Sequence, residues 1–141
     1  MRTSHGFLVL LSALVAAACT SPAKQEAKSL VFAVDHYRQA ENTEKPELAD
    51  AVEAVPCTDA EVCATKEACL AVARPTAKAL RLQREVQKGV AEMQDGSLSP
   101  YDAKAKAFPE KIEQSEKLLA EGQAALEACD TKLTALRVKY R

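Results

Sequence analysis

Five cysteines are the residues of this chain whose type and spacing could do chemistry. They are Cys19, Cys57, Cys63, Cys69 and Cys129. A cysteine thiol can carry a lipid, form a disulfide, bind a metal or act as a nucleophile. An odd number would leave one thiol unpaired in an oxidising compartment, so one cysteine is expected to have a task of its own.

The first of these cysteines follows a segment with the features of an export signal. Arg2 supplies positive charge, residues 7–15 form an apolar run, and the alanines at 16–18 form a small-residue cleavage site. The apolar run is shorter than the roughly 20 residues that a membrane-spanning helix needs. We therefore predict a signal peptide over residues 1–18 and an exported mature chain. Retention of this segment as an anchor is the alternative.

The sequence Val15-Ala16-Ala17-Ala18-Cys19 resembles a bacterial lipobox. The resemblance covers the leader and Cys19, and it implies that Cys19 becomes the lipidated N-terminus of a lipoprotein. Ala16 stands where leucine is usual, so cleavage by an ordinary signal peptidase is the alternative. Because no Asp follows Cys19, the resemblance also implies the periplasmic face of the outer membrane in a Gram-negative source. In a Gram-positive source it implies the outer face of the plasma membrane.

Beyond a short tether over residues 19–23, apolar residues recur at three- and four-residue steps, which is typical of amphipathic helices. This recurrence predicts helices over about 24–41, 47–55, 58–94 and 100–140. Thr58 and Glu61 match a capping box at the start of the third helix. Pro75 and Pro109 are expected to kink or interrupt the third and fourth helices, because proline lacks a backbone donor.

The last two of these helices carry heptad stripes, the pattern of a coiled-coil seam. Folding them antiparallel about Ser99, which is expected to cap the fourth helix, pairs positions whose residue numbers sum to 198. In this register Val72 faces Leu126, and Val86 faces Ile112. The predicted fold class is therefore all-α: an antiparallel, coiled-coil-like hairpin, with the N-terminal helices packing as a small three-helix bundle.

The same register places Cys69 opposite Cys129 inside the seam. A disulfide there would close a loop of about 60 residues and stabilise the fold by roughly 4 kcal/mol in the chain-entropy model. Cys63 lies about 9 Å along the helix from Cys69, too far for a bond between them. This leaves Cys57 to pair with Cys63. Pairing of Cys57 with Cys69 and of Cys63 with Cys129 stays the alternative, and it would need the helix to unwind.

Few other residues could support catalysis. His36 is the one histidine after the predicted leader, and it lies on an ordinary helical pattern. The cysteines lack the closely spaced pairs typical of structural zinc, and neither a phosphate-binding loop nor a hydrolase motif occurs. The net charge of -1 argues against nucleic-acid binding. We predict a non-enzyme without cofactor or metal.

A row of cations on the third helix could bind anionic lipid or an acidic partner. Its members are Arg74, Lys78, Arg81, Arg84 and Lys88. The alternative is that the row flanks the hairpin seam and pairs with acids of the fourth helix. Those pairs would be Lys88 with Glu110, Arg84 with Glu113 and Glu116, and Lys78 with Glu121.

These features predict an exported helical protein of the cell envelope, held at a membrane by lipid on Cys19. It would act as a binding or adaptor module for another envelope protein. A structural spacer is the first alternative: a small lipidated coiled coil resembles the murein lipoprotein in general plan, although this chain turns back at Ser99 and ends in Arg141. An inhibitor of a hydrolase such as lysozyme is the second alternative.

Overall fold

The computed structural model describes residues 21–141, and all secondary-structure elements in that range are helical. In chain order they are α1 (Pro22–Gln39), α2 (Lys45–Ala54), α3 (Ala60–Gln94), α4 (Ala103–Lys106), α5 (Phe108–Ala124) and α6 (Leu126–Lys139). The all-α prediction is confirmed. The predicted signal peptide over 1–18 and Cys19 lie outside the described residues, and the tether predicted to reach Ala23 ends earlier, because α1 begins at Pro22.

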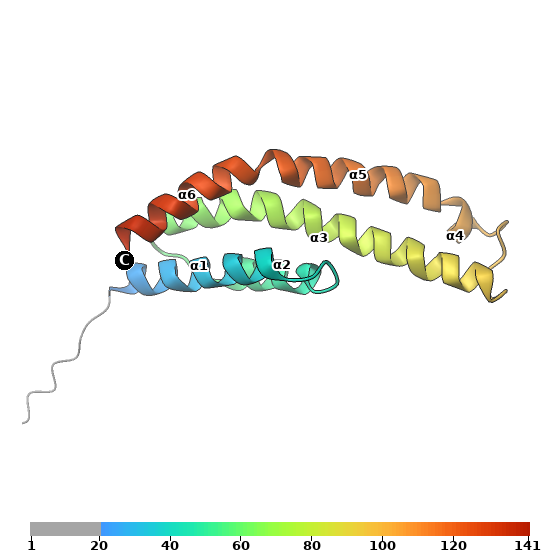
Figure 1. Ribbon diagram of the computed structural model, residues 1–141, viewed down its shortest axis with the longest axis horizontal. Helices are drawn as coiled ribbons and strands as arrows, with labels where there is room; N and C mark the ends of the chain where they lie inside the picture. The colour runs from blue at the N-terminus through green and yellow to red at the C-terminus, as the bar shows by residue number, and fades with distance from the viewer. Residues whose placement is uncertain (1–20) are drawn as a thin grey trace, which may run out of the picture.

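The α3 helix and the segment from α4 to α6 form the two limbs of an antiparallel hairpin, and we call the segment from α4 to α6 the return limb (Figure 1). Its register is as predicted where the two limbs are cross-linked, since Cys69 and Cys129 form a disulfide with their Cα atoms 4.6 Å apart. Cys57 and Cys63 form the second disulfide. The pairing expected from the seam is therefore confirmed, and the alternative pairing is wrong.

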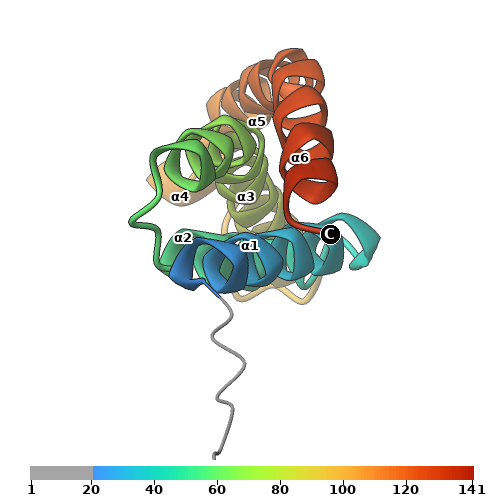
Figure 2. The same cartoon turned by 90° about the vertical axis from the view of Figure 1, so that its left-hand side faces the viewer.

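The α1 and α2 helices form an antiparallel pair that covers only the half of the hairpin nearer the C-terminus (Figures 1 and 2). The α2 helix packs on α3, while α1 contacts α2, α3 and α6. The buried face of α1 consists of Ala27, Leu30, Val34 and Tyr37, which follow the spacing of one helical face. The predicted packing of the N-terminal helices on the hairpin is confirmed. None of the helices in residues 21–141 is both long and apolar enough to cross a bilayer.

The core is divided into two parts of unequal size. The larger part joins α1, α2, the first half of α3 and α6, and it contains Leu30, Leu70 and Leu133, each at most 1% exposed. The smaller part lies near the hairpin turn and is formed by Val86, Ala105 and Phe108. The hairpin is therefore well packed at one end and thinly packed at the other.

The start of α3 differs from the predicted capping box. The cap is Asp59 rather than Thr58. The Asp59 carboxylate accepts the N–H groups of Glu61 and Val62, both at 3.0 Å. Thr58 instead donates its backbone N–H and its hydroxyl to the Glu26 carboxylate of α1, each at 2.7 Å. A contact with another helix therefore uses the hydroxyl that the local pattern assigned to the cap.

The prolines act differently in the two limbs. The α3 helix runs continuously from Ala60 to Gln94 through a buried Pro75, so the prediction that Pro75 interrupts this helix is wrong. Packing against α2 and against the return limb holds α3 together around the missing hydrogen bond. Pro109 does coincide with a restart, since α5 begins at Phe108.

The return limb is not the single helix predicted over 100–140. Ser99 lies in the turn rather than at a helix cap, and its N–H donates to the carboxylate of Asp102, the residue before α4, at 3.0 Å. A further break follows at Ala125, whose N–H donates to the Gly122 carbonyl at 3.3 Å, the i to i−3 hydrogen bond of a 3₁₀ turn. Beyond this turn α6 approaches α1, where Asp130 pairs with an arginine of α1.

Candidate functional site

The residues considered for catalysis lie apart from one another. His36 is exposed on α1, with its ring centroid 6.0 Å from that of Phe32. All four cysteines within residues 21–141 are in disulfides, so they carry no thiolate that could attack a substrate. In the same range, no group of three or more His, Cys, Asp or Glu side chains is arranged to hold a metal.

The arginines of the cationic row on α3 pair with α2. The contacts are Arg74 with Glu53 at 2.8 Å, Arg81 with Asp50 at 2.8 Å and Arg84 with Glu47 at 3.3 Å. The predicted pairing of Arg84 with acids of the return limb is wrong, because α2 covers this side of α3. Among the described residues, Lys78 and Lys88 form no ion pair, so their predicted pairs are wrong too. The arginines thus hold α2 on the hairpin and are engaged within the fold.

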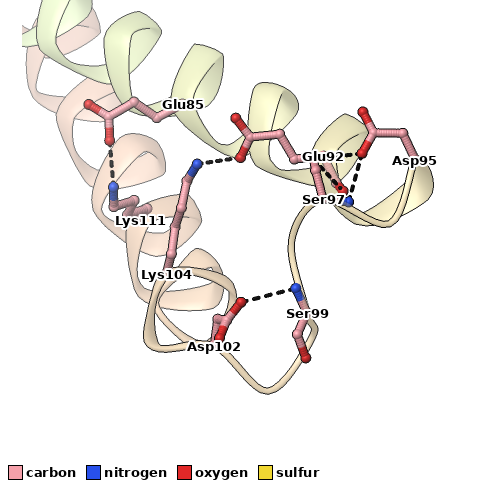
Figure 3. A network of polar contacts seen from close by, with 8 residues as sticks. All are labelled: Glu85, Glu92, Asp95, Ser97, Ser99, Asp102, Lys104 and Lys111. Carbon is pink, nitrogen blue, oxygen red and sulfur yellow. Dashed lines mark hydrogen bonds and ion pairs between the residues drawn. The ribbon is translucent and has the colours of Figure 1, made fainter.

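In the ion pairs near the hairpin turn, α3 supplies the acid and the return limb supplies the lysine, whereas the sequence predicted cations on α3 and acids on the return limb (Figure 3). Lys104 contacts Glu92, and Lys111 contacts Glu85, so acids of α3 meet lysines of the return limb. Further side-chain hydrogen bonds order the turn itself: Asp95 with Ser97, and Asp102 with Ser99. These contacts hold the end of the hairpin, where the apolar core is thin.

A groove of about 490 Å³ lies between α1, α2, α3 and the junction of α5 with α6. Most of its walls are apolar, and these side chains come from all the surrounding helices: Val34, Val52, Val72, Ala73, Leu119 and Leu126. Polar side chains at the groove are Tyr37, Arg38, Lys45, Thr76 and Gln123. Because separate elements supply the walls, the groove exists only in the folded molecule.

The walls supplied by α3 and by α5–α6 are held together at two points along the groove. One point is the Cys69–Cys129 disulfide. The other is Gly122, where a Cβ atom would lie 2.6 Å from the Thr76 hydroxyl oxygen and 3.0 Å from the Val72 carbonyl oxygen. Only a residue without a side chain permits this close approach of the two helices. These two contacts fix how closely α3 and α5–α6 approach each other at the groove.

Two cations lie at the edge of the groove. The Arg38 guanidinium contacts the Asp130 carboxylate and lies 3.3 Å from the Cys129 sulfur. The Lys45 ammonium donates to the side-chain oxygen of Asn42 at 3.2 Å. The groove thus combines apolar walls with one ion pair, Arg38–Asp130, and with the ammonium of Lys45, which forms no ion pair within residues 21–141.

The Tyr37 side chain belongs to the larger core, where it is 6% exposed, and it also lines the groove. Burial raises the pKa of the Tyr37 phenol, and a hydrogen bond with Thr76 partly offsets that rise. Tyr37 was predictable as a member of the apolar face of the first helix. The sequence did not predict that Tyr37 and Lys45 line the same groove, because the periodicity of α1 and α2 does not fix how these two helices pack.

The predicted closed seam is wrong at Leu126. Its side chain is 39% exposed and lines the groove. The break at Ala125 comes directly before Leu126, whereas Cys129, Leu133 and Leu136 beyond it stay buried in the seam. The seam is also open at Ile112, which is 44% exposed although its predicted partner Val86 is buried.

The chain matches no protein-family model, and neither a curated protein nor a solved structure is found to be similar to it. The groove itself is then the best guide to function. Concave, mostly apolar surfaces with a few polar groups are the usual form of a binding site.

Proposed function

We propose that this chain is a lipid-anchored binding module of the bacterial cell envelope, without catalytic activity of its own. Lipid on Cys19 holds it at a membrane, and the groove takes an apolar segment of another envelope protein. In a Gram-negative source the membrane is the outer membrane, seen from its periplasmic face. The module acts as an adaptor, with no part for nucleic acid or a cofactor.

Two features support the export and anchor parts of this proposal. The leader ends in a lipobox-like sequence at Cys19. The other four cysteines form two disulfides, which are typical of oxidising compartments outside the cytoplasm. Pairing of these four leaves Cys19 as the cysteine with a different task.

The binding part rests on one observation, the solvent contact of Leu126 within an apolar groove. Exposed apolar walls are unfavourable in water, and an apolar segment of a partner would remove them from it. The ammonium of Lys45, which lines the groove and forms no ion pair within residues 21–141, favours a segment that carries an acidic residue next to its apolar side chains.

The anchor is tested by Cys19→Ser in cells of the source organism. Wild-type protein is expected in the membrane fraction, with a lipid mass on the peptide that begins at Cys19. The Cys19→Ser protein is expected in the soluble periplasmic or extracellular fraction. Equal membrane retention of both proteins would contradict the anchor.

The binding site is tested by a charge placed in the groove. Leu126→Glu is compared with Ile112→Glu, a substitution at a similarly exposed apolar residue outside the groove. Leu126→Glu is expected to abolish co-purification of a specific envelope protein from crosslinked cells, whereas Ile112→Glu is expected to retain it. Identical co-purification with both variants would favour a spacer. If the captured protein is a lytic enzyme, and if one equivalent of this chain suppresses its activity, the chain is an inhibitor.

A further inference from the structure

The outward side of α1 carries an exposed aromatic ring between a lysine and a histidine. Phe32 is 73% exposed, and Lys28 and His36 are exposed on either side of it. A spacing of four residues places the three side chains in one line along the helix. We call this line, formed by Lys28, Phe32 and His36, the α1 face.

Both carboxylates of α1 are engaged in contacts within the fold, and one of them, Asp35, lines the same shallow pocket as Lys28 and Phe32. Glu26 accepts hydrogen bonds from Thr58, and Asp35 pairs with Arg137 of α6. These are the two acids of the α1 sequence. Within residues 21–141 Lys28 has no carboxylate at ion-pair distance. The α1 face therefore combines an aromatic ring with an unpaired lysine, and the neighbouring acid of its own helix, Asp35, is neutralised by Arg137.

The start of α1 lies close to the proposed anchor. One residue, Thr20, separates Cys19 from Ser21, and the Ser21 hydroxyl caps α1 by accepting the Lys24 N–H at 3.3 Å. Two residue steps span at most about 7 Å. With lipid on Cys19, α1 must therefore begin at the headgroup layer. This step rests on the anchor in the proposed function.

A helix that begins at the headgroup layer can stand upright on the membrane or lie along it. Phe32 is about 16 Å along the helix axis from Ser21, so an upright helix would keep its ring in water. A helix lying on the α1 face places Phe32 among the headgroups, where aromatic rings are favoured. It also places Lys28 beside the lipid phosphates. The exposure of Phe32 therefore favours the lying orientation.

We infer that the α1 face binds the anionic headgroups of the leaflet that holds the lipid of Cys19, with Phe32 inserted between them. Because α1 runs alongside α3, the hairpin then extends along the membrane (Figure 1). The α5 helix lies on the opposite side of α3 from α1 and α2, and so it faces away from the lipid (Figures 1 and 2).

Single tryptophans can test this contact, because the chain contains no Trp. Phe32→Trp and Ile112→Trp are made separately in the lipidated protein, and each is reconstituted in phosphatidylcholine vesicles with phosphatidylglycerol and a brominated lipid quencher. Ile112 is the control because it is exposed on α5. We expect Phe32→Trp fluorescence to be quenched several-fold more than Ile112→Trp fluorescence, with a blue-shifted emission. Circular dichroism checks that both variants keep the helical fold.

The outcomes separate the membrane contact from the anchor. Equal quenching of the two tryptophans, in protein whose mass shows lipid on Cys19, would overturn the contact and leave the anchor intact. A mass without lipid on Cys19 would overturn the anchor and, with it, the contact. Replacing phosphatidylglycerol by phosphatidylcholine is expected to reduce quenching of Phe32→Trp, and undiminished quenching would overturn the requirement for anionic headgroups.

Discussion

Leu126 and Leu133 are on the same helix but differ in their contact with solvent. The Leu126 side chain is 39% exposed, and that of Leu133 is 1% exposed. Leu133→Ala is expected to lower the free energy of unfolding by about 2–5 kcal/mol, because it leaves a cavity in the larger core. Leu126→Ala is expected to cost less than about 1 kcal/mol. Urea denaturation of the two variants measures both values, and equal losses would mean that Leu126 is packed within the hairpin.

The two disulfides close loops of different length and should differ in their effect on stability. Cys69–Cys129 closes 60 residues, and Cys57–Cys63 closes six. In the chain-entropy model, replacing the first pair by serine lowers the free energy of unfolding by about 4 kcal/mol, and replacing the second by about 2 kcal/mol. Denaturation of the double-serine variants measures the two effects. A larger loss from the short loop would contradict the entropic explanation.

At the scale of the elements, Glu26 ties α1 to the segment before α3 and makes stability depend on pH. The backbone N–H and the hydroxyl of Thr58 donate to the Glu26 carboxylate and hold its pKa below the usual value of 4.5. Because the pKa of Glu26 is lower in the folded state than in the unfolded chain, the ionised carboxylate stabilises the fold at pH values above the unfolded-state pKa. This stability is lost as the pH falls below about 4.5 and through the folded pKa.

Removal of that carboxylate should therefore weaken the acid dependence of stability. Between about pH 5 and pH 3, the free energy of unfolding of Glu26→Gln is expected to fall less than that of the wild type. Glu41→Gln, an exposed change in the loop after α1, serves as the control and should follow the wild type. Parallel pH profiles for the wild type and Glu26→Gln would contradict the role of this contact.

The hairpin register could be predicted from sequence, whereas the break between α5 and α6 could not. Heptad periodicity records which residues face the partner helix, and one register brought Cys69 opposite Cys129. The break at Ala125 has no local signal, because alanine is the best helix former. Beyond this break α6 contacts α1, a helix distant in sequence whose position the heptad pattern does not record.

The candidate site was harder to predict than the fold for the same reason. Tyr37 and Lys45 come from two helices whose packing angle is not recorded in the periodicity of either one. The arginines of α3 had a clear pattern in the sequence, but their acidic partners lie on α2 rather than on the return limb. Charge spacing showed that a row existed, and only the packing of α2 showed which helix it meets.

At the scale of the whole molecule, the unequal cores predict unequal local stability along α3. Residues 62–77 pack in the larger core under α1 and α2, whereas residues 85–94 rest on the small cluster around Phe108. Amide hydrogen exchange measured by mass spectrometry is expected to be faster in residues 85–94 than in residues 62–77. Uniform protection along α3 would mean that the hairpin opens only as one unit.

The most direct test of the groove as a binding site is crosslinking from within it in intact cells. A photoreactive amino acid is placed at Gln123, which is exposed and lines the groove, and separately at Thr131, an exposed position of α6 outside it. We predict that one envelope protein crosslinks to position 123 and not to position 131, and that Cys19→Ser abolishes the product. The same products from both positions, or none from position 123, would contradict a binding role for the groove.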